Sequence, residues 1–253
     1  MHSFKLVIQR ALLLIRDLFD PAMHFGEVSV LCYHSISDAS SNTVVSKNTF
    51  EHHIALLKKS GAPIVPLSDI VAWARGEKTL PRKAVALTFD DGYVDFKTDV
   101  VPLLERYQIP AAVFIIGDPE AARQYLGNNI PTLSNEDISA LRAHRLVEVG
   151  YHSTTHANLA RLTQNALTAE VASPFPVRFF AYPGGNHSPE VAEALQKAGY
   201  EAACTIGRDL VSRAPDPYHI PRTVIMRDSE LWQVRFATTR ASHWFRTVGR
   251  LFK

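Results

Sequence analysis

The sequence TFDDGY at residues 88–93 is the most informative stretch of this 253-residue chain. It follows the apolar run AVAL at 84–87, and a short apolar run closed by a turn signal is typical of a buried strand. Asp90 and Asp91 then lie at the mouth of that strand. Two adjacent carboxylates are unfavourable there unless a metal ion or a reaction uses them. The alternative interpretation is a plain turn, because Asp-Gly suits one.

A second sequence, HSTTH at 152–156, supplies two imidazoles with the spacing of metal ligands. One carboxylate and two imidazoles can hold a zinc-type ion and leave coordination positions open. The other carboxylate is then free to act as a base on water. A His-x-x-x-His pair alone is usually accidental, but the acid pair favours ligation here.

The composition indicates an ordinary globular protein with one main domain, which we place at residues 27–228. Hydrophobic residues make up 46% and charged residues 21%, and the formal net charge of +2 is too small to suggest a nucleic-acid partner. Cys32 and Cys204 lie in apolar, strand-like segments, so we expect buried thiols and no disulfide framework.

Strand-like and helix-like segments alternate along this domain, which predicts an α/β fold with a mostly parallel sheet or barrel. Pro102 lies inside the helical pattern at 96–107, so a kink or a late start is expected there. The chemistry of such barrels gathers at the C-terminal ends of the strands. His34, Asp90, Asp91, His152 and the turn YPGG at 182–185 all follow strand ends. The predicted strands are 28–33, 84–89, 111–116, 146–149, 177–182, 202–206 and 219–226.

The two ends of the chain have a different character. Residues 1–26 are predicted to form an amphipathic helix, whose apolar core at 11–15 is too short for a signal peptide or a membrane span. Residues 229–253 are predicted to form a basic helical segment, with five Lys and Arg and no acid from Arg235 onward. We expect a cytoplasmic protein whose terminal helices pack on the domain. Peripheral contact of both segments with the inner face of a membrane is the open alternative.

These motifs resemble a known family. TFDDGY at 88–93, HSTTH at 152–156 and FAYPGG at 180–185 are similar, in this order, to three motifs of the polysaccharide deacetylases, the NodB-homology or carbohydrate esterase family 4 group. The resemblance implies a distorted (β/α) barrel of NodB-homology type and metal-dependent removal of N-acetyl groups from amino sugars. It also implies that Asp90 is the base and that Asp91, His152 and His156 hold the metal.

Three departures from the family pattern matter, one of which is a segment between His156 and Arg178 that is shorter than the family's usual helix. Ala181 stands where the third motif usually has an arginine that orients the base, and Arg222 is our candidate to supply that charge; pairing with a surface acid is equally open. The late motif with a general-acid histidine has no match, but LCYHS at 31–35 resembles a subset in which that histidine lies near the N-terminus. His34 is therefore the candidate acid. A structural role for His34 and competition from His219 stay open.

The expected cofactor is a divalent metal, Zn²⁺ first, with Co²⁺, Ni²⁺, Mn²⁺ and Fe²⁺ as alternatives. The oxyanion of the reaction would be held by the metal and by backbone N–H groups in the turn Tyr182, Pro183 and Gly184. Tyr93 is expected either to pack beside the metal or to line the substrate groove.

The predicted activity is hydrolysis of N-acetyl or other N-acyl groups on amino sugars of a polysaccharide or a lipid-linked glycan. Two alternatives remain. The first is a catalytically silent carbohydrate-binding relative, motivated by Ala181. The second is a deformylase or amidase that acts on a different C–N amide bond.

Overall fold

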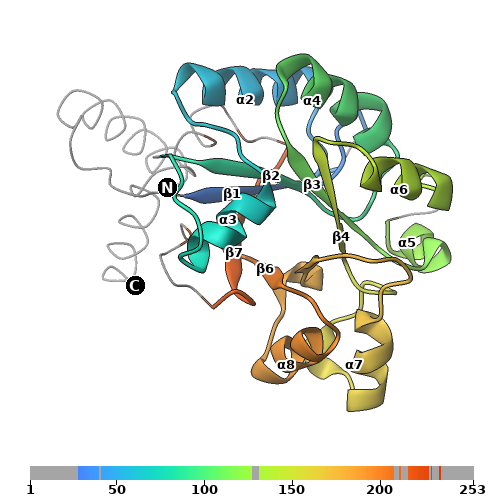
Figure 1. Ribbon diagram of the computed structural model, residues 1–253. Coiled ribbons are helices and arrows are strands. Elements are labelled where there is room, and N and C mark those ends of the chain that lie inside the picture. Colours follow the sequence, from blue (N-terminus) through green and yellow to red (C-terminus); the bar gives the residue numbers. More distant parts are fainter. Residues whose placement is uncertain are drawn as a thin grey trace, which may run out of the picture.

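The computed structural model describes residues 28–39, 41–81, 83–126, 131–207, 211, 216–227, 229 and 234. Within them, seven parallel strands form a closed barrel in sequence order, with β7 beside β1 (Figure 1). The predicted mostly parallel (β/α) barrel is thus confirmed. The strands are β1 (Ser29–Tyr33), β2 (Val85–Phe89), β3 (Ala111–Ile115), β4 (Val147–Tyr151), β5 (Phe179–Ala181), β6 (Ala202–Ile206) and β7 (Ile220–Val224).

All seven predicted strands are present, but β5 is shorter than the predicted 177–182. It pairs with β4 only through Tyr151 and Phe180. The N–H of Tyr182 still donates to the Cys204 carbonyl at 3.0 Å, and then Pro183, which has no N–H, ends the ladder. This short strand makes the barrel irregular on the side of the third motif.

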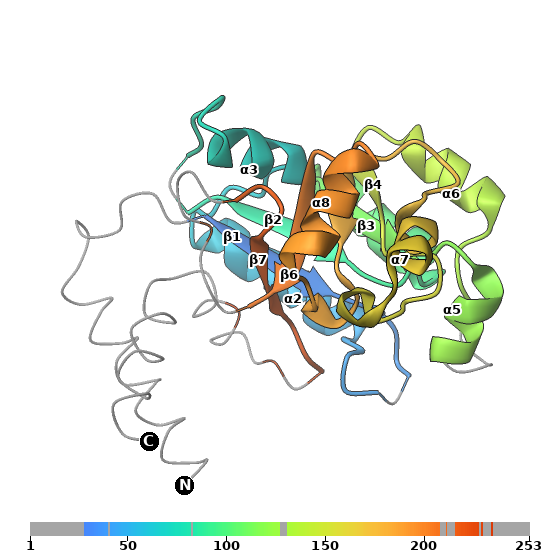
Figure 2. The same cartoon turned by 90° about the horizontal axis from the view of Figure 1, so that it is seen from below.

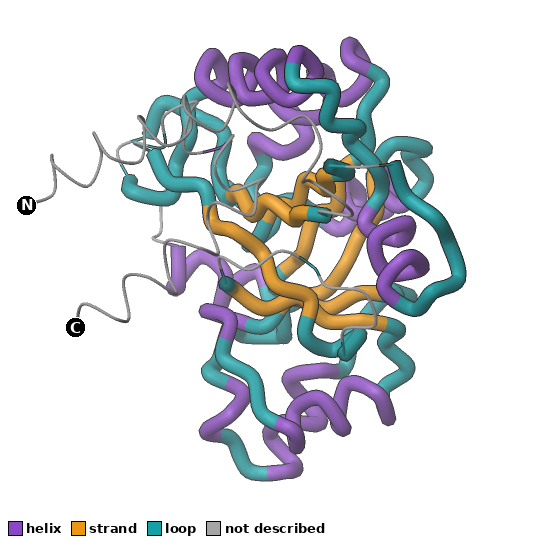
Figure 3. The backbone as a smooth tube through the Cα atoms, turned by 90° about the vertical axis from the view of Figure 1, so that its left-hand side faces the viewer, coloured by secondary structure: helices purple, strands orange, loops and turns teal. Residues whose placement is uncertain are grey.

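Helices surround the strands, which lie at the centre of the tube in Figure 3. Helices α2 and α4 cover one side of the barrel, while α7 and α8 lie together on another side (Figures 1 and 2). Helices α5 and α7 were not predicted from the sequence. The helices are α2 (Lys47–Lys59), α3 (Leu67–Ala74), α4 (Val101–Tyr107), α5 (Pro119–Leu126), α6 (Asn135–Arg142), α7 (Gln164–Val171) and α8 (Pro189–Lys197).

The irregularity expected at Pro102 takes the form of a π-helical turn, η1 (Phe96–Val100), which runs directly into α4 and places Pro102 in the first turn of α4. The Val101 N–H donates to the Phe96 carbonyl across this junction. Pro102 has no N–H to donate to the preceding turn, and the wider π-helical turn accommodates it there.

The barrel interior is built from alternate strand residues, because successive side chains of a strand point to opposite faces. Val30, Ala86, Ala112 and Phe114 belong to this buried inner cluster, together with apolar residues of α3. Helix α3 therefore closes the N-terminal end of the barrel. Toward the C-terminal ends of the strands the inward positions become polar, and these positions form the candidate site.

The predicted terminal helices at 1–26 and 229–253 lie outside the described residues, apart from the isolated positions Ser229 and Val234. No helix in the described part of the chain is long and apolar enough to cross a membrane.

Gly150 of β4 lies beside Phe114 of β3 in the barrel interior, where there is no room for a larger side chain. A Cβ at this position would lie 2.5 Å from the ring of Phe114 and 2.9 Å from the carbonyl oxygen of Phe179. Gly150→Ala should therefore overpack the barrel and lower the free energy of unfolding by about 1–3 kcal/mol. Urea unfolding measures this change.

Gly76→Ala is the control, because its Cβ would meet nothing within 4 Å although its φ is +78°. Only backbone strain of about 1–2 kcal/mol applies there, and the site should be untouched. Because Arg222 lies over the Phe114 ring, at 5.2 Å from its centroid, Gly150→Ala should also lower activity, whereas Gly76→Ala should not. Equal activity of the two variants would contradict this account of the interior.

Candidate metal and catalytic site

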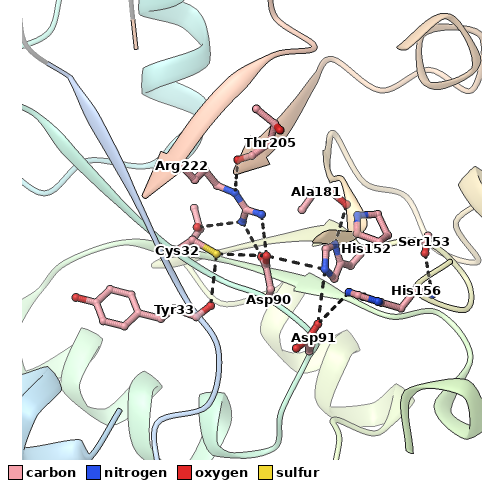
Figure 4. A network of polar contacts seen from close by, with 12 residues as sticks. Cys32, Tyr33, Asp90, Asp91, His152, Ser153, His156, Ala181, Thr205 and Arg222 are labelled. Atoms are coloured by element: carbon pink, nitrogen blue, oxygen red, sulfur yellow. Dashed lines mark hydrogen bonds and ion pairs between the residues drawn. The ribbon is translucent and has the colours of Figure 1, made fainter. Parts of the chain in front are cut away.

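The barrel register brings the predicted residues to one level. His34, Asp90 and His152 each follow the last residue of a strand, and each occupies the next inward position. The Asp90 N–H donates to the Tyr33 carbonyl at 3.0 Å, and the His152 N–H donates to the Ile115 carbonyl at 2.8 Å. The parallel ladders thus continue one step past β2 and β4 and hold the Asp90 and His152 side chains at the C-terminal end of the barrel (Figure 4).

Asp91, His152 and His156 come together as expected. One donor atom of each lies within 4.8 Å of the others. The Asp91 Oδ1 is 3.6 Å from the His152 Nε2 and 3.8 Å from the His156 Nε2. Asp91 and His152 are buried, and His156 is nearly so. Nitrogen and oxygen donors from two separate loops therefore face one small volume.

Left-handed backbone places two of these ligands. Asp91 has a φ of +74°, and Ser153 and His156 have φ values of +64° and +60°. Such conformations are unfavourable for non-glycine residues by about 1–2 kcal/mol each, and they persist where the surroundings enforce them. The Ser153 hydroxyl oxygen accepts from the His156 N–H at 2.9 Å, which closes the HSTTH turn.

The hydrogen bond that the Nδ1 atom of His152 makes determines the tautomer of this ring. Its Nδ1 lies 2.7 Å from the carbonyl oxygen of Ala181. A carbonyl only accepts, so Nδ1 carries the hydrogen, and the Nε2 lone pair is left free on the side of Asp91. Ala181, which replaces the arginine of the family motif, thus serves the site through its backbone.

The protonation chemistry fits a divalent cation. Burial, followed by the negative charge of Asp90, raises the pKa of Asp91 to about 8. Burial lowers the pKa of His156 to about 3 and also lowers that of His152, so both imidazoles are neutral, which is the ligand form. The buried Asp91 Oδ1 has no hydrogen-bond partner among the described residues. A cation between these donors would stabilise the carboxylate and satisfy that oxygen.

Asp90 has a different partner, Arg222 of β7. The guanidinium donates to both carboxylate oxygens, from Nη1 to Oδ1 at 2.6 Å and from Nη2 to Oδ2 at 2.7 Å. Arg222 is 0% and Asp90 2% exposed, so the open alternative of a surface ion pair for Arg222 is wrong. Burial alone would raise the pKa of Asp90, but the Arg222 charge outweighs it and lowers that pKa below its ordinary value.

Arg222 is itself held on several sides. It donates to the Thr88 hydroxyl at 3.2 Å and lies over the Phe114 ring. It therefore places a fixed positive charge behind Asp90, where the family pattern would use the arginine of the third motif. Asp90 also lies close to the three metal-ligand candidates, because its Oδ2 is 3.9 Å from the His152 Nε2.

His34 lies on the other side of Asp90. A donor atom of each of Cys32, His34 and Asp90 lies within 4.8 Å of the others, and the Cys32 thiol donates to the Asp90 Oδ2 at 3.3 Å. His219, the competing histidine, is exposed, precedes β7 and packs against the ring of His187 with centroids 4.4 Å apart. The structure thus places His34, and not His219, beside Asp90.

The substrate and oxyanion candidates are only partly in place. Tyr93 is buried next to Asp91, whose charge adds to burial in raising the pKa of Tyr93. The side chain of Tyr182 packs outside the barrel, where its hydroxyl donates to the Tyr218 carbonyl at 2.9 Å. The Tyr182 N–H is used in the β5–β6 ladder and Pro183 has none, so of the three predicted turn residues only Gly184, whose φ is +60°, keeps an N–H outside that ladder.

Two neighbours of the site were not predicted. Cys32 lies two residues before His34. Because strand side chains alternate between the two faces, this spacing could have predicted that both point into the barrel. Tyr125 of α5 stacks on the His156 ring, with centroids 3.7 Å apart and an interplanar angle of 26°, yet it is 55% exposed. No sequence signal connects Tyr125 to His156, because the contact joins helix α5 to the loop after β4, 31 residues apart in the chain.

Comparison with known proteins decides the family. Residues 77–203, half of the chain, match the family model described as polysaccharide deacetylase. The chain belongs to the polysaccharide deacetylase family. The resemblance noted in the three motifs is confirmed, and the predicted enzyme class is that of this family.

Relatives cover most of the chain. YxkH of Bacillus subtilis (strain 168) is 28% identical over 206 residues, which are 78% of this chain and 71% of the relative. The poly-beta-1,6-N-acetyl-D-glucosamine N-deacetylase of Escherichia coli (strain K12) is 26% identical over 83% of this chain but only 38% of its own length. The chain therefore corresponds to well under half of that relative.

Solved structures share the fold. IcaB from Ammonifex degensii has a TM-score of 0.70 and 24% identity, covering 84% of this chain and 97% of its own. The Streptococcus pyogenes deacetylase PplD in complex with acetate has a TM-score of 0.71 and 18% identity, covering 85% and 99%. At these identities the likeness establishes the barrel architecture.

The Asp90–Arg222 pair generates a prediction about acid stability. Since the folded pKa of Asp90 lies below its ordinary value of 3.8, the pair contributes stability that is present above pH 4 and lost as the pH falls further. The difference in unfolding free energy between the wild type and Asp90→Asn should therefore shrink below pH 4, by up to about 1.4 kcal/mol per pH unit. Urea unfolding between pH 6 and pH 3 measures it. A difference that stays constant over this range would show that Asp90 is not held ionised by Arg222.

Proposed function

We propose that this protein hydrolyses N-acetyl groups on amino sugars of a polysaccharide, with Asp90 as the base beside a divalent ion held by Asp91, His152 and His156. Family membership supports the reaction class. The observation that carries the proposal is the adjacency of two differently tuned carboxylates, one facing two neutral imidazoles and the other paired with Arg222. Relatives from Escherichia coli and Staphylococcus aureus that are named for poly-beta-1,6-N-acetyl-D-glucosamine N-deacetylation favour a β-1,6-linked N-acetylglucosamine polymer as substrate.

A divalent ion bound by these ligands, with Zn²⁺ as the expected one, would lower the pKa of water and polarise the amide carbonyl. The three ligands differ in charge. Asp91 brings one negative charge, while His152 and His156 are neutral, so the trio leaves a bound dication with a net positive charge. His152 is the best oriented of the three, because the Ala181 carbonyl fixes its tautomer.

Asp90 is suited to take a proton from the attacking water. Arg222 keeps it ionised at neutral pH and fixes the plane of its carboxylate through two hydrogen bonds. The same pairing weakens Asp90 as a base, so the arrangement favours orientation over basicity. Asp90 therefore depends on the metal to make water acidic, and neither carboxylate suffices alone.

His34 is suited to pass that proton to the leaving amine. Burial lowers the pKa of His34, so the ring is neutral at rest and can deliver a proton only after it has received one. Its position beside Asp90 provides the donor. The single proton removed from water can thus reach the nitrogen of the amino sugar, and the N–H of Gly184 would help to hold the oxyanion.

The same site geometry bears on the two alternative functions, the silent carbohydrate-binding relative and the hydrolase of another C–N amide bond. Ala181 motivated the silent carbohydrate-binding relative, but Arg222 supplies the charge that Ala181 lacks. Hydrolysis of another C–N amide bond, including a formamide, would use the same residues and is separated only by substrate. The cytoplasmic location, the lipid-linked glycan and the contact with a membrane surface depend on the terminal segments and stay predictions.

The proposal is tested by acetate release from β-1,6-linked N-acetylglucosamine oligomers. Acetate should appear, stop after treatment with a chelator, and return when Zn²⁺ or Co²⁺ is added back. Formamide-bearing and non-sugar amide substrates run in parallel identify the alternative activities. A metal-loaded protein that binds the oligomers and releases no acyl group from any of them would favour the silent binder.

Asp90→Asn separates the two carboxylates. This variant should lower turnover by at least about a thousandfold, since the base is lost, while the bound metal per chain stays unchanged. Elemental analysis and acetate release measure the two quantities. Asp69→Asn is the matched control, because Asp69 lies in α3 at the opposite end of the barrel and pairs with Lys78 at 2.6 Å. Loss of metal together with activity in Asp90→Asn would mean that the roles of Asp90 and Asp91 are exchanged.

A further inference from the structure

A second set of metal donors lies inside the barrel where β1 and β2 end, and the reaction proposed above does not use them as metal ligands. We propose that Cys32, His34 and Asp90 form a weaker second site for a thiophilic divalent cation such as Zn²⁺ or Cd²⁺, and that filling it inhibits the enzyme. The binding part stands on the geometry alone. The inhibitory part rests on the proposed function, because it requires Asp90 and His34 to take part in the reaction.

The strand register builds this site. Cys32 lies on β1 and His34 directly follows this strand, two residues further on, so both point into the barrel. Asp90 follows β2, whose last residue Phe89 is paired with Tyr33, and this register puts Asp90 level with His34. One donor atom from each residue lies within 4.8 Å of the others.

The distances suit a small, soft cation. The Cys32 Sγ lies 3.3 Å from the Asp90 Oδ2. A tetrahedral zinc ion holds sulfur at about 2.3 Å and oxygen at about 2.0–2.2 Å, which separates the two ligand atoms by about 3.5 Å. The cation would take the place of the thiol proton between these atoms. Binding exchanges the S–H bond of Cys32 for a sulfur–metal bond and releases the proton to solvent.

The third donor is available and reachable. The buried Nδ1 of His34 has no hydrogen-bond partner within the described part of the chain. His34 as a whole is partly exposed, whereas Cys32 and Asp90 are buried. A cation can therefore enter past the imidazole. Thiolate, imidazole and carboxylate together select zinc-like ions over Mg²⁺ or Ca²⁺.

Charge makes this site weaker than the Asp91 site. Arg222 binds both oxygens of Asp90 and repels a nearby cation. The two sites also adjoin, because the Asp90 Oδ2 is 3.9 Å from the His152 Nε2, so a first bound ion opposes a second. The second site should therefore fill only in metal excess. Once filled, it removes the carboxylate that accepts the proton and the histidine that delivers it.

Cadmium provides a direct test, because a cadmium–thiolate bond has its own ultraviolet charge-transfer absorption and the Asp91 site contains no sulfur. The chain has two cysteines, so the signal is assigned by substitution. Protein loaded with one equivalent of Zn²⁺ is titrated with Cd²⁺. The band should appear in the wild type and in Cys204→Ser, and should be absent in Cys32→Ser. Acetate release should fall at least about tenfold at saturation in the wild type, and Cys32→Ser should need at least about tenfold more Cd²⁺ for the same loss.

His34→Gln gives an independent variant in case Cys32→Ser does not fold. It should raise the Cd²⁺ concentration needed for the charge-transfer band at least about tenfold. No band at saturating Cd²⁺, a band that persists in Cys32→Ser, or a band lost in Cys204→Ser would overturn the site. If the band follows Cys32 while the wild type deacetylates nothing, the second site stands and the proposed function fails. If the band follows Cys32 and activity is unaffected by saturation, the inhibitory role is overturned.

Discussion

The buried ion pair between Asp90 and Arg222 is the interaction on which the site depends. A carboxylate that is 2% exposed, adjacent to a second buried carboxylate, would ordinarily be protonated. The Arg222 guanidinium compensates the cost of burying a negative charge for Asp90 alone. Asp91 has no such partner, and burial together with the Asp90 charge raises its pKa to about 8. Two neighbouring residues of one type thus receive opposite properties from their surroundings. Arg222 keeps Asp90 ionised, and the proposed cation would ionise Asp91.

The barrel makes this division possible. An apolar cluster that includes Phe114 lies below the site, and Arg222 lies on the Phe114 ring, so the charge is fixed from below. Above it, the parallel ladders hold His34, Asp90 and His152 at one level. Asp91 and His156 do not occupy inward positions of the strand alternation. Left-handed backbone at these two residues turns their side chains toward the site. Regular strands therefore position Asp90, His34 and His152, while left-handed loop residues place Asp91 and His156 beside them.

The alternation of strands and helices predicted the barrel, and the two local motifs predicted that one of the adjacent carboxylates would meet His152 and His156. The choice of Asp91 rather than Asp90 as that carboxylate came from the family resemblance. It could not decide the place of Arg222, because the partner Asp90 is 132 residues away and an arginine in a strand usually faces solvent. Helix α5 was missed although its signal was present, since the Asp118 carboxylate accepts from the Glu120 N–H at 2.8 Å. The stacking of Tyr125 on His156 had no local signal. The role of the Ala181 backbone could not be predicted either, because any residue could offer that carbonyl.

The central claim is that Asp91, His152 and His156 bind one divalent ion beside Asp90. Anomalous diffraction at the zinc edge, from crystals grown with one equivalent of Zn²⁺, tests it most directly. The account predicts a single strong peak about 2.0–2.2 Å from an Asp91 carboxylate oxygen and from the Nε2 atoms of both histidines. A peak bound by other side chains, or crystals with Zn²⁺ in the drop and no peak at these three residues, would contradict it.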